Sequence, residues 1–158
     1  MDAQNLLAAV IALEPKAEQR PKCGPKFDQA AVSIPNDILF EFMHKLRNKP
    51  ELEFDILYTH TAIDLPEENR IELIYQLFSL KNCHYLLVST SVPRNNPITF
   101  SVNSIWQIAQ WQEREVYDMF GVLYRNHDDL RRLFLEDDWQ GFPLLKDYKD
   151  DFMLERPQ

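Results

Sequence analysis

A cluster of charged side chains near position 115 contains residue types that could act in acid–base catalysis. Glu113, Arg114, Glu115 and Asp118 follow one another closely, beginning just after Trp111. Paired carboxylates can hold unequal pKa values and act as proton donor and acceptor. The alternative is a structural role, because charged side chains among aromatic residues tend to be buried and must then be paired. Arg114 and Asp118 are four positions apart and would form such an ion pair on a helix. We favour this structural interpretation, because helix faces of this kind are more often structural than catalytic.

A histidine with two neighbouring acids is the next candidate. His127 precedes Asp128 and Asp129, and an imidazole can act as a general base or a metal ligand. No second histidine lies three or four positions away, and two adjacent aspartates make a poor ligand set. We therefore expect His127 to form structural hydrogen bonds. A small hydrolase that uses Glu113 or Asp118 with His127 remains the alternative.

Arginines and acids alternate in the region that follows. Arg131 and Arg132 stand a few positions before the acidic run 136–138. This spacing favours arginine–carboxylate forks, within the chain or to a partner. Trp139 lies where no helical or strand period is visible. We expect it to anchor an interface with another protein, because buried tryptophans dominate the binding energy of interfaces.

The elements that must position these residues follow from hydrophobic spacing. Alternation of apolar and polar residues predicts three strands in an antiparallel meander, at 54–62, 70–80 and 84–92. A further short strand is expected at 30–34, with helices at 5–14 and after Pro35. These elements predict an α+β fold with a small, mainly antiparallel sheet and helices on one face.

A last helix is expected to carry the charged cluster. Ser101 is a suitable N-cap, and the helix would run to Phe120. Gly121 would end it in the left-handed conformation and turn the chain. We therefore divide the chain into a globular α/β domain at 1–121 and an extended C-terminal segment at 122–158.

Composition excludes several classes of function. The chain has 158 residues, a net charge of −8 and two cysteines, Cys23 and Cys83. An acidic protein is a poor partner for nucleic acid. Two distant cysteines cannot by themselves ligate an iron–sulfur cluster or a structural zinc ion. The longest aliphatic run, 6–13, is too short to span a membrane, so we expect a cytosolic chain.

The C-terminal third resembles a known family in the order and spacing of its residues. It is similar to the 30-kDa subunit of respiratory complex I, also called its C subunit, and to the J subunit of the photosynthetic NDH complex. The resemblance rests on Glu113, Arg114, Glu115, Asp118, Met119, Phe120, Gly121, His127, Leu130, Arg131, Arg132, Asp138, Trp139, Gly141, Pro143, Leu144, Lys146, Asp147 and Tyr148.

The resemblance implies a protein without a redox centre of its own. It would lie in the peripheral arm, on the cytoplasmic face of the membrane. It would pack against the large, hydrogenase-like D subunit. The iron–sulfur B subunit would lie nearby, and the clusters and flavin would belong to these and other partners. This chain would hold the D and B subunits in place, so that electrons pass through the complex from NADH or a related donor to quinone. The residues expected to dock on the partner are Trp139, Pro143, Lys146, Asp147 and Tyr148.

Two positions depart from the family pattern. Asp128 stands where the family usually has proline, and Leu145 replaces an arginine. A cation able to pair with a neighbouring protein is therefore missing at position 145. Besides the hydrolase, the alternatives are an adaptor of a related membrane-bound hydrogenase or F420 dehydrogenase, and a free-standing adaptor.

Overall fold

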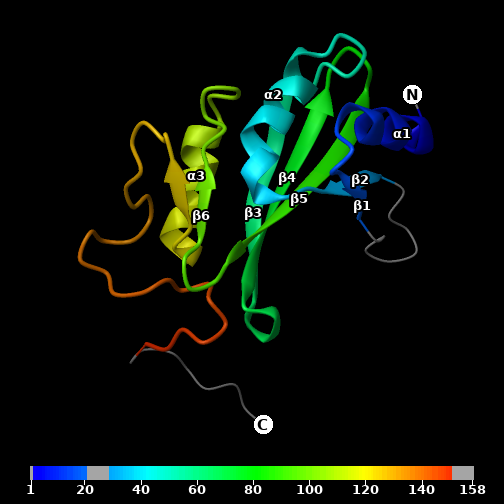
Figure 1. Cartoon of the computed structure of the whole chain (residues 1–158). Coiled ribbons are helices and arrows are strands. Elements are labelled where there is room, and N and C mark those ends of the chain that lie inside the picture. Colours follow the sequence, from blue (N-terminus) through cyan, green and yellow to red (C-terminus); the bar gives the residue numbers. More distant parts are fainter. Residues whose placement is uncertain (1, 21–28, 151–158) are drawn as a thin grey trace.

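A five-stranded sheet forms the centre of the molecule (Figure 1). The computed structural model describes residues 2–20 and 29–150. The strand order is β1-β2-β5-β4-β3, and the predicted meander is confirmed, since β3–β4 and β4–β5 pair antiparallel. The strands are β1 (Glu18–Gln19), β2 (Ala30–Ser33), β3 (Ile56–Leu65), β4 (Arg70–Ser79) and β5 (His84–Pro93).

Strand β2 is the exception to antiparallel pairing. It runs parallel to β5, with Val32 opposite Val88. Two parallel neighbours must be joined by a long crossover connection. Between β2 and β5 this connection contains a helix and the β3–β4 hairpin. The expected α+β fold with a mainly antiparallel sheet is confirmed.

Alternation along the strands separates a buried face from an open one. Every second residue of β4 is buried, from Ile71 to Ser79. Helix α2 (Leu39–Asn48) contributes four buried side chains to the same core, and α1 (Ala3–Leu13) contributes Leu6 and Val10. Such burial stabilises the fold by about 1.5–3 kcal/mol for each large aliphatic or aromatic side chain.

Helix α3 (Ala109–Phe120) runs beside β3, the last strand of the sheet (Figure 1). The Gln112 amide donates a hydrogen bond to the Tyr58 carbonyl of β3 at 3.5 Å. The side chain of His60 is buried, and its ring stacks on Tyr75 at 4.0 Å. Its Nδ1 donates to the Ile74 carbonyl, so that Nε2 accepts from the Tyr124 hydroxyl at 2.6 Å.

The start of the last helix differs from the sequence expectation. Helix α3 begins at Ala109, and the preceding residues form turns. Ser101 therefore does not cap a helix: its hydroxyl contacts the carboxyl group of Glu113 instead. The end of the helix is as predicted, because Gly121 caps it with φ of 78°.

A small second sheet follows the helix. Strands β6 (Ile98–Phe100) and β7 (Leu123–Arg125) pair in parallel. After β7 the chain has no regular elements as far as residue 150 and loops around the outer side of α3 (Figure 1). This path places the charged and aromatic residues of the C-terminal third around one helix.

Candidate functional site

Glu113 is buried without a lysine or arginine partner among the described residues. Its side chain is 0% exposed. One carboxyl oxygen accepts the Val102 N–H at 2.7 Å, and the other lies 2.5 Å from the Ser101 hydroxyl. Burial raises the pKa of Glu113 to about 7, although the hydrogen bonds from Ser101 and Val102 act in the opposite direction. Glu113 thus fixes the chain at 101–102 to α3.

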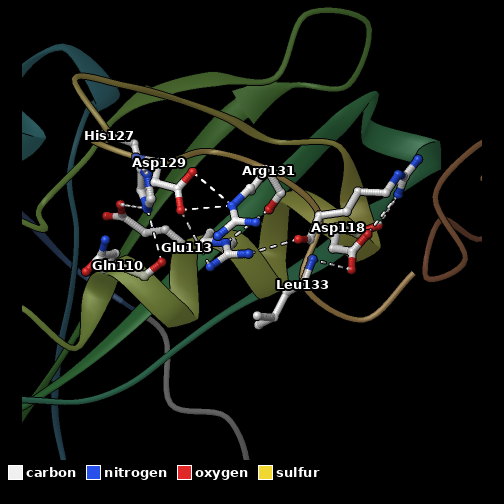
Figure 2. Close-up of polar contacts among 9 residues, drawn as sticks. Gln110, Glu113, Asp118, His127, Asp129, Arg131 and Leu133 are labelled. Atoms are coloured by element: carbon white, nitrogen blue, oxygen red, sulfur yellow. Dashed lines mark hydrogen bonds and ion pairs between the residues drawn. The ribbon is translucent and has the colours of Figure 1, made fainter. Parts of the chain in front are cut away.

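His127 packs beside Glu113, but both of its ring nitrogens are engaged (Figure 2). Nδ1 accepts the Asp129 N–H at 3.1 Å, so that Nε2 carries the proton and donates to the Gln110 carbonyl at 3.1 Å. Nε2 lies 3.9 Å from the Glu113 carboxyl group, and neither side chain is exposed. This arrangement suits the expected structural role and leaves no lone pair for a general base or a metal ion.

Asp118 holds the C-terminal segment through three consecutive backbone amides. Its Oδ2 accepts the N–H groups of Leu133, Phe134 and Leu135 at 3.1, 2.7 and 3.1 Å. Its Oδ1 accepts Arg132 Nη1 at 2.8 Å. Burial alone would raise the pKa of this carboxyl group, but the four donors outweigh it and hold the pKa below its ordinary value. Asp118 is therefore an ionised anchor (Figure 2).

Arg132 joins Asp118 to the turn at 139–142. Its Nη2 donates to the carbonyls of Trp139 and Gly141 at 2.9 and 3.1 Å. Its guanidinium group also lies over the Phe142 ring, 5.4 Å from the centroid. One side chain thus connects the end of α3 to both ends of the turn at 139–142. The fork expected at Arg132 is not formed: only Nη1 binds the Asp118 carboxylate, because Nη2 is engaged by the two carbonyls.

Arg114 does not pair with Asp118, so the ion pair expected from their spacing is wrong. Arg114 instead donates to the carbonyls of Arg131 and Arg132 at 3.1 and 2.9 Å, and its guanidinium group lies over the Trp111 ring. Helical spacing places two residues on one face, but each of these side chains binds the chain that crosses that face. Arg131, for its part, contacts both oxygens of the exposed Asp129 at 3.0 Å.

The two glycines of the C-terminal third lie where rings approach the backbone. A Cβ at Gly121 would lie 2.5 Å from the Phe142 ring. A Cβ at Gly141, whose φ is 84°, would lie 2.8 Å from the Tyr148 ring. Left-handed backbone and close packing both require glycine here. The turn of the chain expected at Gly121 is thus combined with a packing contact.

A second anchor joins the C-terminal segment to the sheet. Asp64 of β3 is buried and accepts Arg94 through both oxygens, at 2.8 and 3.1 Å. It also accepts the Lys146 N–H at 2.8 Å. Arg94 reaches Asp147 as well, so that it bridges two carboxylates. Burial would raise the pKa of Asp64, but Arg94 and Lys146 hold it below its ordinary value.

Two residues of the expected docking set take part in this second anchor. The Lys146 N–H binds Asp64 of β3, and the Asp147 carboxylate binds Arg94, which directly follows β5. Both residues are exposed, and their contact with a partner stays a prediction. Tyr148 packs at Gly141 and donates its hydroxyl to Asp150 at 3.2 Å. Leu145, in place of the family arginine, packs against the core.

The remaining members of the expected docking set are only partly exposed. Trp139 and Pro143 are half-buried, and Pro143 lies in the turn closed by the hydrogen bond from Leu145 N–H to the Phe142 carbonyl. The side chains of Phe134 and Leu144 are 66% and 50% exposed. The described part of the segment is therefore fixed to its own domain without burying all of its apolar groups. Residues 151–158 lie outside the described residues.

Sequence reasoning missed Asp64 and Arg94. Asp64 occupies an inward position in the alternation of β3, where a charged residue must find a partner. That signal was visible in the sequence, but its partner Arg94 lies 30 positions away, beyond the next two strands. No period or local spacing connects two such residues.

Metal ligands do not gather anywhere in residues 2–20 and 29–150. No group of three or more His, Cys, Asp and Glu side chains there has an arrangement for a metal ion. Cys23 lies outside this part of the chain. Within the same ranges, no helix combines the length and apolar character needed to cross a membrane.

The similarity to known proteins decides the family. Residues 32–151 match the model of a family described as the respiratory-chain NADH dehydrogenase 30-kDa subunit. The chain belongs to this family. The match begins within β2 and extends over β3, β4, β5 and the anchored C-terminal segment, and it confirms the resemblance found in the C-terminal third.

Relatives within the family are named as the C subunit of NADH-quinone oxidoreductase. The protein from Chlorobium phaeobacteroides is 39% identical over 105 residues, which are 66% of this chain and 63% of that one. The protein from Moorella thermoacetica is 37% identical over 122 residues, covering 77% and 81%. A protein of Phocaeicola vulgatus named as the C/D subunit is 41% identical over 75% of this chain, and the match covers 22% of its own length.

Solved structures share the fold. A chain of the membrane-bound sulfane sulfur reductase, an archaeal respiratory membrane complex, aligns with a TM-score of 0.78 at 23% identity, covering 92% of this chain and 85% of that one. The trypsin-resistant fragment of Nqo5 aligns with a TM-score of 0.68 at 24% identity, covering 82% and 100%. The family fold thus also occurs in a respiratory membrane complex of another kind.

Proposed function

We propose that this chain is a non-catalytic assembly subunit of an NADH:quinone oxidoreductase or a related complex. It fixes the D-like and B-like subunits at a constant separation, so that electrons pass between their centres to quinone. The chain contributes no redox centre, and the iron–sulfur clusters and flavin belong to the partners. The complex lies on the cytoplasmic face of the membrane, with this chain at its periphery.

The anchored C-terminal segment is the observation that carries this proposal. Asp118 and Asp64 hold it by buried carboxylates at two places. Between these anchors Phe134 and Leu144 remain exposed. Exposed apolar side chains on a segment that is already held at two places are available for contact with another protein. Of the proposed docking part at 122–158, the residues through β7 pack with the globular part, so the contact with a partner is assigned to the residues after β7.

The D-like partner has separate support. The Phocaeicola relative is named as the C/D subunit and has most of its length outside the match. Fusion of two subunits in one relative favours contact between the separate subunits in another. The B-like partner is inferred from the family resemblance alone, and it belongs to the same proposal.

Co-purification from native membranes tests the proposal. The chain, tagged at its N-terminus and expressed at its natural level, should bring down D-like and B-like subunits in equal amounts. Purification in mild detergent should preserve NADH:quinone activity in the eluate, while the chain alone has none. Recovery of the chain alone from a preparation in which the complex stays intact would refute the assembly role and favour a free-standing adaptor.

The geometry opposes the hydrolase alternative. Glu113 and His127 are close, but both side chains are fully buried and His127 has no free nitrogen. Asp118 has four hydrogen-bond donors around its carboxylate. A catalytic group must be able to contact its substrate. The side chains of Glu113, His127 and Asp118 are all buried and engaged within the chain.

A further inference from the structure

The chain that follows β7 crosses α3 and is held at three points along the helix. We call residues 126–135 the crossing segment. Gln110, Arg114 and Asp118 of α3 each bind one part of it. The first of these contacts joins the His127 ring to the first turn of α3, with Nε2 3.1 Å from the Gln110 carbonyl oxygen. His127 therefore closes the beginning of the crossing segment on the helix.

The carboxyl group of Glu113 lies directly beside this closure (Figure 2). Its Oε2 is 3.9 Å from His127 Nε2 and 2.5 Å from the Ser101 hydroxyl. Its Oε1 accepts the Val102 N–H at 2.7 Å. Because the side chains of Glu113 and His127 are both 0% exposed, water reaches the carboxyl group only when the protein opens.

No lysine or arginine of the described part of the chain forms an ion pair with Glu113, and the titratable groups that face it from the sheets are neutral. Arg114, the next residue of α3, is directed at backbone carbonyls of the crossing segment. Tyr75 of β4 and Tyr124 of β7 are buried, and burial above all raises the pKa of both hydroxyls, with a smaller contribution from the charge of Glu113. His60 of β3 is neutral too, because burial lowers its pKa to about 4.

His127 can carry a positive charge only by giving up its hold on the crossing segment. Its Nε2 already carries a proton, so a second proton must go to Nδ1. Nδ1 is the acceptor of the Asp129 N–H at 3.1 Å, and a protonated Nδ1 cannot accept it. The nearby acids have other partners, since Asp129 binds Arg131 at 3.0 Å and the exposed Asp128 accepts the Asn103 amide. The closed segment therefore requires a neutral imidazole beside Glu113.

A neutral imidazole leaves an ionised Glu113 without a counter-charge in a place that excludes water. A buried carboxylate in such surroundings is strongly disfavoured relative to the protonated acid. Burial accordingly raises the pKa of Glu113 to about 7, against the hydrogen bonds from Ser101 and Val102. When the crossing segment opens, water reaches the carboxyl group, and its pKa returns toward the ordinary value of 4.5. The closed form thus holds a proton that the open form releases.

We propose that Glu113 and His127 form a proton-linked clasp, in which closure of the crossing segment on α3 takes up a proton from solvent at the Glu113 carboxyl group. The proton resides on Oε2 and is donated to the Ser101 hydroxyl, since Oε1 accepts the Val102 N–H. The O–H bond of the acid is the one bond that forms on closure and breaks on opening. The clasp is a property of the single chain and does not depend on the assembly role.

The clasp makes the attachment of the C-terminal segment depend on pH. Below about pH 4.5, Glu113 is protonated in both forms, so pH has no effect through this group. Between about pH 4.5 and about pH 7 the open form loses the proton and the closed form keeps it, so opening becomes about tenfold more favourable for each pH unit. Above about pH 7 both forms are ionised and the effect levels off.

Hydrogen exchange in the full chain tests the clasp at the Asp129 amide. The natural chain is compared with E113Q, whose side-chain amide keeps both contacts of the protonated acid and cannot ionise. The matched control E115Q makes the same change at an exposed glutamate two positions along α3. Protection factors, which are corrected for the intrinsic exchange rate, are measured at pH 5 and pH 8. His127 is present in all three chains, so its own titration cancels when each chain is compared with E113Q.

We expect the protection of the Asp129 amide, relative to E113Q, to fall roughly fiftyfold from pH 5 to pH 8 in the natural chain and in E115Q. Amides of β4 should be more protected than Asp129 at both pH values, since the opening is local. Carbon-13 labelling of the glutamate carboxyl groups gives a second readout, in which Glu113 of the natural chain should titrate at about pH 7. This readout does not require E113Q to fold.

Three results would overturn the clasp. A ratio that changes by less than about threefold would show that opening at 127–129 leaves Glu113 buried. Equal protection of Asp129 and the β4 amides would show that Glu113 meets water only on complete unfolding. A Glu113 carboxyl group that titrates near its ordinary value, or an E115Q chain that loses the pH effect, would show that the buried acid is not the group that holds the proton. Each of these results leaves the assembly role standing.

Discussion

Replacement of Asp118 gives the sharpest test of how the C-terminal segment is held. In Asp118→Ala, three backbone N–H groups and the Arg132 guanidinium lose their acceptor. Removing one partner from a buried ion pair costs about 3–5 kcal/mol. We therefore expect the free energy of unfolding to fall by about 4 kcal/mol, measured by urea denaturation with circular dichroism.

Asp118→Asn divides this effect into its parts. The amide oxygen can replace Oδ2 and accept the three N–H groups, but its NH₂ group would then face Arg132. Loss of one charge-assisted hydrogen bond costs about 1.5–3 kcal/mol, so about 2 kcal/mol of stability should disappear. Hydrogen exchange should show the amides of residues 133–135 protected in Asp118→Asn and unprotected in Asp118→Ala.

The pH dependence provides a second readout for Asp118. Its pKa is lower in the folded chain than in the unfolded chain, because the four donors outweigh burial. The resulting stability is present above the ordinary pKa and disappears as the pH falls through the lowered value. The difference in melting temperature between the natural chain and Asp118→Asn should therefore shrink from about pH 7 toward about pH 2. As a control, exposed Asp137→Ala should change stability by less than about 0.5 kcal/mol.

The anchoring argument for Asp118 is refuted by a specific combination of results. Asp118→Ala would have to cost less than about 1 kcal/mol and leave the exchange of residues 133–135 unchanged. That result would mean that the segment is held by its apolar contacts alone.

Three further predictions concern other contacts of the site. Gly121→Ala should lower the free energy of unfolding by about 2–4 kcal/mol in urea denaturation, since a left-handed residue with a Cβ against Phe142 combines backbone strain and overpacking; a loss below about 0.5 kcal/mol would contradict this. Glu113 has a raised pKa of about 7, so stability should fall by up to about 3 kcal/mol as the pH rises from about 4.5 to about 8. Glu113→Gln, which mimics the protonated acid, should remove this fall in urea titrations, and an identical pH profile in both chains would refute it. Arg94→Lys loses the planar group that binds both oxygens of Asp64 and of Asp147, so trypsin should cut after Lys146 several times faster than in the natural chain, whereas unchanged cleavage would show that the second anchor is dispensable.

The sequence predicted those features that depend on local spacing. Alternation located β3, β4 and β5 to within a few residues, and Gly121 marked the end of α3. These signals are local, since each strand records in its own pattern which face is buried. The fold class and the family followed from them and from the order of residues in the C-terminal third.

The sequence did not predict which charged groups pair. Arg114 and Asp118 have the correct spacing for an ion pair, yet each binds the chain that crosses the helix. Ser101 has the chemistry of an N-cap, but it meets Glu113 twelve positions later. A side chain selects its partner among everything the tertiary fold brings near, and local spacing carries no information on that choice.

The position of α3 beside β3 also limits how other chains can attach. Gln112 occupies the Tyr58 carbonyl at the outer edge of β3, and the opposite edge of the sheet is the two-residue β1. An incoming peptide needs a row of free amide and carbonyl groups to join a sheet by β-augmentation. The bond from Gln112 occupies one carbonyl of such a row on β3, and the two residues of β1 offer only a short row at the opposite edge.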